Sequence, residues 1–251
     1  HYLSSDLSID LDDNDKADDI DDIPSKESIQ KAMDEVKDTR RLIVYLADHG
    51  GDKAFRLSAS ETLSALELKA YLDNFQTSPD KEVIVIYDAC NAESFLEALR
   101  PDGEASMILI GSSELNQNAY FINQGTISFS IFFWTRIFNG QDLDSAYNSV
   151  SEAYSYFPGF QNPVIEKHGS LASIDDPIFI GNGANTERSA PNISVTIKDQ
   201  KSFIEVTATI DNWENIRRVW AVMFPPSHRP DASDKTILEL PSVEMFHGPM
   251  G

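Results

Sequence analysis

The sequence predicts an α/β protein in which a mostly parallel β-sheet is flanked by helices and followed by a partial β-sandwich. Three observations support this fold class. Short apolar runs, suited to strands buried on both faces, alternate with helical patterns up to about residue 182. Beyond about residue 190, apolar and polar side chains alternate between turns, which is typical of antiparallel strands. The 251 residues suffice for one large domain or two smaller ones.

The first part of the chain alternates predicted strands and helices. Residues 25–36 have apolar side chains at helical spacing, and Ser25 or Ser28 is the expected cap. The continuous apolar run 42–46 predicts a buried strand, and further buried strands are expected at 82–90 and 105–113, with a short hairpin arm at 54–58. The remaining predicted helices are 60–75, with Ser60 near its cap, 92–100, 127–140 and 142–157.

The second part of the chain has a different pattern of apolar and polar residues. Residues 1–182 form the predicted α/β domain, residues 183–190 a linker, and residues 191–251 the partial β-sandwich. Its expected strands are "ISVTIKD", "FIEVTATID", "RRVWAVMF" and "TILELPSVEM". We interpret its large aromatic side chains as core residues of this domain, not as a ligand platform: Trp213, Trp220 and Phe224.

The charge of the chain excludes some partners. There are 41 acidic and 20 basic residues, which gives a formal net charge of −21. This charge argues against nucleic acid, whose phosphates would be repelled, and suits a protein that binds cations. No apolar run is long enough for a membrane span, and a single cysteine excludes an internal disulfide framework. The oligomeric state is left open.

The only cysteine lies where a predicted strand ends, in "VIVIYDACNAESF". Taken alone, Cys90 is either a small buried hydrophobe or a nucleophile at the mouth of a sheet. Another apolar run ends in "ADHGG", and neighbouring parallel strands would bring His49 and Cys90 to one edge. An imidazole there can activate the thiol, and the Gly50 and Cys90 N–H groups can bind an oxyanion. The remaining histidines are expected to be surface residues: His1, His168, His228 and His247.

These two blocks resemble those of the legumain-like cysteine peptidases, a branch of the caspase-fold clan marked by His-Gly and Ala-Cys blocks. Further stretches are similar to bacterial secreted members of that family. They are "YLSSDLSIDLDDND", "FRLSASETLSALEL", "YDACNAESFL", "AYFINQGTISFSIFFWTRIFNG" and "QNPVIEKHG". The resemblance covers residues 2 to about 182 and implies a caspase-like sheet and an extracellular or cell-envelope location. The segment after Ala190 resembles an immunoglobulin-like accessory domain of secreted bacterial proteins.

The resemblance also implies a function. It assigns the nucleophile to Cys90 and proton transfer to His49, so the expected activity is a cysteine endopeptidase acting on peptides or proteins through a thioacyl intermediate. A transamidase or ligase of the same family, and an inactive caspase-like scaffold that binds through calcium, are the alternatives. The family's sheet begins with a strand upstream of Tyr2, so we expect that first strand to be missing here.

The resemblance leaves substrate specificity open. Asp88 has the position of an acidic pocket residue of the family, and an acid there can bind an amide or a basic side chain. The alternative role of Asp88 is to satisfy backbone donors at the strand end. Ser112 and Ser113 begin a segment, up to Tyr120, that is expected to form one pocket wall. Ser128 stands where legumain has an acidic pocket residue, so asparagine specificity does not carry over.

An acidic loop predicts a structural calcium site. In "DLDDNDKADDID" (10–21), oxygen-bearing residues fall at positions 1, 3, 5, 7, 9 and 12 of a calcium loop. These residues are Asp10, Asp12, Asn14, Lys16 through its carbonyl, Asp18 and Asp21. Position 6 is Asp15 instead of glycine, and position 12 is aspartate instead of glutamate. A solvated acidic loop is the alternative. We favour Ca²⁺ and expect no organic cofactor.

Overall fold

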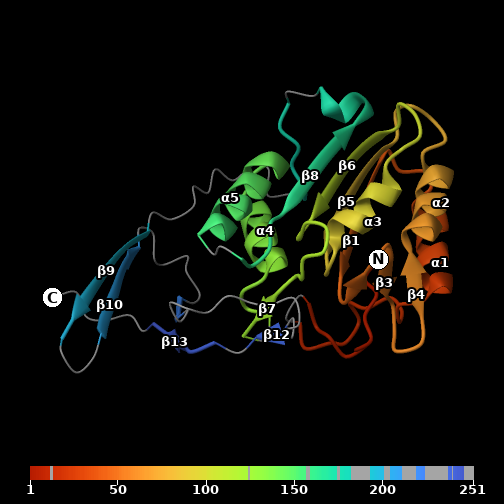
Figure 1. Ribbon diagram of the computed structural model, residues 1–251. Helices are drawn as coiled ribbons and strands as arrows, with labels where there is room; N and C mark the ends of the chain where they lie inside the picture. Colours follow the sequence, from red (N-terminus) through yellow and green to blue (C-terminus); the bar gives the residue numbers. More distant parts are fainter. Residues whose placement is uncertain are drawn as a thin grey trace.

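The centre of the molecule is a four-stranded sheet in the order β1-β5-β6-β8 (Figure 1). The computed structural model describes residues 1–11, 14–123, 125–156, 159–173, 176–181, 193–200, 204–210, 219–223, 237–238 and 240–245. The strands are β1 (Arg41–Ala47), β5 (Glu82–Asp88), β6 (Ser106–Gly111) and β8 (Val164–His168). The first three are parallel, and β8 pairs antiparallel with β6. The predicted mostly parallel sheet flanked by helices is confirmed.

Side-chain caps fix where the helices begin. The helices are α1 (Lys26–Val36), α2 (Ala65–Phe75), α3 (Ala92–Leu99), α4 (Phe129–Phe138), α5 (Leu143–Ser155) and the short 3₁₀ helix η1 (Gly169–Ala172). Of the two expected caps, Ser25 is the one that caps α1, and it forms a capping box with Ser28. The prediction that α2 begins near Ser60 is wrong, because Ser64 and Glu67 form the capping box.

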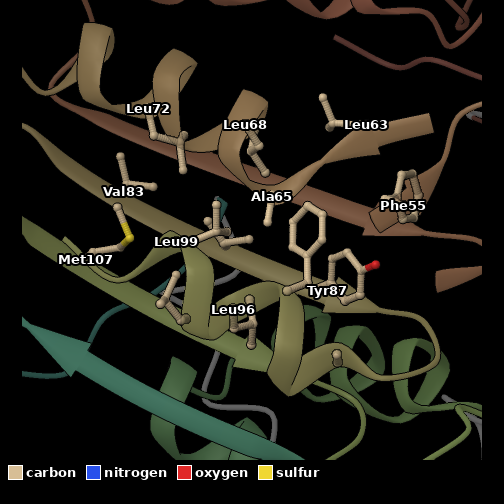
Figure 2. Close-up of a cluster of buried hydrophobic side chains, with 14 of the residues drawn as sticks. Phe55, Leu63, Ala65, Leu68, Leu72, Val83, Tyr87, Leu96, Leu99 and Met107 are labelled. Atoms are coloured by element: carbon tan, nitrogen blue, oxygen red, sulfur yellow. The ribbon is translucent and has the colours of Figure 1, made fainter. Parts of the chain in front are cut away.

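One face of the sheet is covered by α1, α2 and α3. Val83, Val85 and Tyr87 of β5 point into this layer and are fully buried. Figure 2 shows Tyr87 beside Phe55, whose ring it meets edge to face at 5.6 Å. Burying each such side chain stabilises the fold by about 1.5–3 kcal/mol.

The other face is covered by α4 and α5. Ile84 and Ile86 of β5 point to this side and pack with Phe129 and Phe133, the buried aromatic pair of α4. Because β5 alternates its side chains between two cores, all seven of its residues are buried. This explains why its inner residues, Val83 to Tyr87, form a continuous apolar run.

A small sheet leads from β1 to α2. It consists of β2 (Gly50–Gly51), β3 (Ala54–Arg56) and β4 (Thr62–Ser64) in sequential antiparallel order. Leu63 therefore lies in a strand and is fully buried. Leu66, in the first turn of α2, is 69% exposed.

The C-terminal part is described only in pieces. β9 (Ile193–Asp199) and β10 (Ile204–Ile210) form an antiparallel hairpin, and β11 (Trp220–Val222) pairs antiparallel with β13 (Ser242–Glu244). β12 (Ile237–Leu238) pairs with β7 (Phe121–Ile122). The linker 183–190, Trp213, Phe224, His228 and His247 lie outside the described residues. In the described part of the chain, no helix has the length and apolar character of a membrane span.

Candidate active site

The ends of β1 and β5 meet at the carboxyl edge of the sheet. The parallel register pairs Ala47 with Asp88. His49 lies two residues after Ala47, and Cys90 lies two residues after Asp88. This is the juxtaposition that the sequence predicts. It places an imidazole and a thiol on neighbouring chain ends, at the edge where α/β sheets bind ligands.

Cys90 lies between the buried strand β5 and the first turn of α3. Its Sγ is 3.9 Å from the backbone oxygen of Ala119, and the side chain is half-buried. Burial raises the pKa of the thiol, and the charge of Asp88 raises it further. A partner is therefore needed to make the thiolate at neutral pH, and a protonated imidazole is one that lowers a thiol pKa.

Asn91 makes the sharp turn that presents Cys90. Its backbone is left-handed, with φ 59°, and asparagine tolerates this region better than most residues. The Asn91 N–H donates to the Gln117 oxygen (2.8 Å), and its Oδ1 accepts from the Asn116 N–H (2.8 Å). The loop after β6 therefore braces the turn that carries the nucleophile candidate.

Gly50 packs directly on the Cys90 backbone. A Cβ at this position would lie 2.4 Å from the Cys90 oxygen, 2.8 Å from the Ala89 Cβ and 2.9 Å from the Tyr87 hydroxyl. Only glycine allows this approach, because such contacts are far inside van der Waals distance. The His-Gly and Ala-Cys motifs, which are far apart in the sequence, are therefore in direct contact in the structure.

The backbone pattern leaves the Gly50 N–H turned away from β3. The Arg56 N–H donates to the His49 oxygen (3.0 Å), so these two residues form a hydrogen-bonded pair of the ladder. Gly50 is opposite Phe55, the next pair along. Hydrogen-bonded and non-bonded pairs alternate in antiparallel sheets, so the Gly50 N–H does not point to β3. It is available to an acceptor on the other side.

His49 is exposed, and its position is fixed through the backbone. Its N–H donates to the Asp48 carboxylate (2.5 Å), which also pairs with the Arg56 guanidinium (2.8 Å). The other described histidines differ in setting: His1 lies by Asp21 and Glu35, while His168 is the last residue of β8 and is half-buried.

Asp88 is a buried carboxylate two residues before Cys90. Its Oδ2 accepts from the N–H (3.0 Å) and hydroxyl (2.5 Å) of Ser130, at the start of α4. Tyr45 donates to the same hydroxyl (2.6 Å). Burial raises the pKa of Asp88, and the Ser130 and Ser112 hydroxyls oppose this rise. Among the described residues, Asp88 Oδ1 has no hydrogen bond of standard geometry, although the Ser112 hydroxyl is close.

The three serines expected to line a pocket are buried and bound to backbone groups. Ser113 donates to the Ala89 oxygen (3.1 Å) and accepts from the Ala92 N–H (3.1 Å), and Ser112 donates to the Ala89 oxygen at 3.5 Å. Ser128 caps α4 by accepting from the Ile131 N–H (3.2 Å). They hold the Ala89–Cys90 turn and the start of α4. Ser130, which the sequence did not single out, is the serine that reaches Asp88.

The acidic loop is partly described. Asp10 accepts from the Asn14 (3.2 Å) and Asp15 (2.7 Å) N–H groups, and Asp21 from the Tyr2 N–H (2.7 Å). Asp15 has φ 63°, the left-handed conformation that favours glycine at position 6 of a calcium loop. Lys16 and Asp18 are exposed, and Asp12 lies outside the described residues. Over the described residues, no three His, Cys, Asp or Glu side chains are grouped to hold a metal.

Comparison with known proteins adds one result. The model of the Peptidase C13 family matches residues 22–156, which is just over half of the chain. The matched range contains the contact between Gly50 and Cys90 and the buried Asp88, but not the loop 10–21. No curated protein matches the chain.

Proposed function

Since the chain belongs to the Peptidase C13 family, the legumain family of cysteine peptidases, we propose that it is an endopeptidase with Cys90 as nucleophile. The observation that carries the proposal is the contact of Gly50 with the Cys90 backbone, which joins the His-Gly and Ala-Cys motifs. A protein substrate is the partner that the family implies.

In the proposed reaction, His49 accepts the Cys90 proton and the thiolate attacks the carbonyl carbon of the scissile peptide. The tetrahedral intermediate collapses when His49 gives that proton to the leaving amine, and a thioester to Cys90 remains. Water, deprotonated by His49, then attacks the thioester. This step releases the new carboxyl group, and the sulfur takes the proton back.

The Gly50 and Cys90 N–H groups are the proposed oxyanion donors. The Gly50 N–H is turned away from the β3 ladder, and the Gly50 backbone packs on that of Cys90. Donors fixed in the backbone need no reorganisation as negative charge develops on the substrate oxygen. The two donors belong to segments that are already in contact, which keeps their spacing constant.

Asp88 is the proposed acceptor for the substrate residue that precedes the cut bond. One of its oxygens is bound by Ser130, while Oδ1 has no standard hydrogen bond among the described residues. A buried acceptor of this kind is stabilised by a donor group. An amide or a basic side chain can supply one. Ser112, Ser113 and Ser128 fix the neighbouring backbone, at Ala89 and at the start of α4.

We infer that the acidic loop 10–21 binds a structural Ca²⁺, because Asp15 has the left-handed turn conformation that such loops use at this position. A loop of this charge suits an extracellular setting, where calcium is millimolar.

The transamidase alternative differs only in that an amine replaces water in the second step.

The test is cleavage of a fluorogenic peptide library in millimolar calcium or with chelator, with Cys90→Ala as control. Cleavage that requires Cys90 supports the peptidase and identifies the residue preferred before the cut. In parallel, iodoacetamide labelling of Cys90 at neutral pH is compared between the wild type and His49→Ala. Labelling no faster than that of a free thiol, together with no cleavage, would favour an inactive scaffold.

A further inference from the structure

A short chain of hydrogen bonds joins the buried carboxylate of the site to a tyrosine on the neighbouring strand. Tyr45 donates to the Ser130 hydroxyl at 2.6 Å, and Ser130 donates to Asp88 Oδ2 at 2.5 Å. Neither Tyr45 nor Ser130 takes part in the proposed reaction. The chain nevertheless ends on the side chain that is proposed to recognise the substrate residue before the cut bond.

The sheet register explains why these three side chains meet. Tyr45 of β1 is paired with Ile86 of β5, and Asp88 follows Ile86 by two residues. Residues two apart in a strand point to the same face of a sheet. Ile86 packs on the face covered by α4 and α5, so Asp88 points to that face as well. Ser130 lies in the first turn of α4, where both its hydroxyl and its N–H (3.0 Å) reach Asp88.

The direction of the chain is fixed at the Tyr45 end. The Tyr45 ring meets that of Trp134 edge to face at 5.3 Å. The Trp134 indole N–H, which can only donate, lies close to the Tyr45 hydroxyl, without a hydrogen bond of standard geometry among the described residues. Burial raises the pKa of Tyr45, so its hydroxyl keeps its proton at neutral pH. Tyr45 therefore donates to Ser130, and the single hydroxyl proton of Ser130 is left for Asp88.

A Ser130 hydroxyl aligned in this way favours the ionised form of Asp88. Its bond lowers the pKa of a carboxyl group that burial raises. Hydrogen bonds in a chain strengthen one another, so the Tyr45 bond adds to the effect of Ser130. Besides Tyr45, the described titratable groups on which the Asp88 charge acts are Cys90 and Tyr154 of α5, and that charge raises the pKa of both. Neither is a cation, so the Asp88 carboxylate depends on its hydrogen-bond donors.

We propose that Tyr45 is a positioning residue, which acts through Ser130 to hold Asp88 as an ionised acceptor for the substrate residue before the cut bond. Tyr45 itself does not touch the substrate. The role in substrate binding rests on the proposed peptidase function, whereas the alignment of Asp88 does not. Tyr45→Phe is the informative change, because it removes the hydroxyl and keeps the ring that packs on Trp134.

Carboxyl NMR tests the alignment without any activity. In protein with isotope-labelled aspartate, the Asp88 signal is the one absent from Asp88→Asn, and its titration gives the pH at which the proton is lost. We expect this midpoint to rise by about half a pH unit in Tyr45→Phe. It should rise by about one in Ser130→Ala, which removes a bond to a charged group.

Tyr147→Phe is the matched control. Tyr147 is also a half-buried tyrosine, and its hydroxyl makes a bond of similar length, to the Pro163 oxygen (2.8 Å). Its removal should leave the Asp88 midpoint unchanged. No rise of the midpoint in Tyr45→Phe, or an equal rise in Tyr147→Phe, overturns the proposal.

The double variant shows whether Tyr45 acts through Ser130. Without the Ser130 hydroxyl, the Tyr45 proton has no group to align. Tyr45→Phe should therefore not move the midpoint further in a Ser130→Ala background. Unconnected structural effects of the two substitutions would add instead, so an additive result also overturns the proposal.

Peptide cleavage tests the role in substrate binding. Below the midpoint, half a pH unit changes the ionised fraction of Asp88 about threefold. Tyr45→Phe should therefore raise KM about threefold for a peptide with an amide or basic residue before the cut, with kcat unchanged, and Tyr147→Phe should change neither. A constant KM together with a moved midpoint overturns the role in binding.

The two readouts separate this inference from the proposed function. If the midpoint moves as expected but no variant cleaves peptides, the alignment of Asp88 stands and the peptidase function fails. If cleavage requires Cys90 but neither the midpoint nor KM responds to Tyr45→Phe, the inference fails alone.

Discussion

Replacing Gly50 by alanine should separate the two motifs of the site. The new methyl group would lie 2.4 Å from the Cys90 oxygen and 2.8 Å from the Ala89 Cβ, whereas ordinary contacts are at least about 3.4 Å. Something must move by about 1 Å. β5 is buried on both faces and cannot yield, so the segment carrying His49 and Gly50 must shift away from Cys90.

The expected magnitude follows from this shift. Overpacking of a tight contact costs about 1–3 kcal/mol, and each kcal/mol lowers the Tm of a protein of this size by about 2–4 °C. Misplacing catalytic groups by about 1 Å lowers kcat/KM about 100-fold. The Tyr87 hydroxyl, 2.9 Å from the new methyl group, would also lose its bond to the Ala54 oxygen (3.2 Å).

Gly51→Ala is the matched control. A Cβ at Gly51 has nothing within 4 Å, and no positive φ opposes alanine there. The assay is kcat/KM on the best library peptide, together with Tm and the iodoacetamide labelling rate. We expect Gly51→Ala to remain within about twofold of the wild type. If Gly50→Ala does the same, the contact does not position the oxyanion donor and the reasoning is refuted.

Three further predictions concern pH and calcium. Burial raises the pKa of Asp88, so the wild type loses stability as pH rises through that pKa. Asp88→Asn does not titrate, so its Tm relative to that of the wild type should increase from about pH 4 to about pH 8. A constant difference in Tm would contradict this. The bond to Lys26 and the capping box lower the pKa of Glu67 to about 2. The carboxylate therefore stabilises the folded protein above its usual pKa, and this stabilisation is lost as pH falls toward 2. Glu67→Gln should therefore lower the free energy of unfolding at neutral pH by no more than an exposed pair allows, about 1 kcal/mol, and leave it unchanged near pH 2. Millimolar calcium should raise the Tm of the wild type but not of Asp10→Asn/Asp18→Asn; no shift in the wild type would argue for a merely solvated loop.

The parallel core of the fold could be predicted from the sequence because its strands are unambiguous. Residues 83–87 are apolar without a break, and the structure buries every one of them. Once β1 and β5 are known to be parallel neighbours, their ends must meet, and the proximity of His49 and Cys90 follows. The antiparallel strand β8, Val164–His168, was missed because Glu166, Lys167 and His168 interrupt any apolar pattern. Its half-buried edge position explains why those charges are tolerated.

The surroundings of Asp88 could not be predicted in the same way. Ser130 is 42 residues further along the chain, and nothing local indicates that α4 begins against the end of β5. Ser128, two residues earlier, has the stronger sequence signal and caps the helix instead. The difference between a capping serine and a binding serine depends on tertiary packing. The same holds for β12, whose partner strand is more than a hundred residues away.

The burial of β5 also determines how Cys90 responds to fluctuations of the protein. The strand belongs to both cores at once, so neither layer of helices can open locally without disturbing it. Segments of this kind exchange with solvent only when the whole domain unfolds. The reactivity of Cys90 toward small electrophiles should then report the native state alone, and stay constant under mild denaturant until the cooperative transition begins.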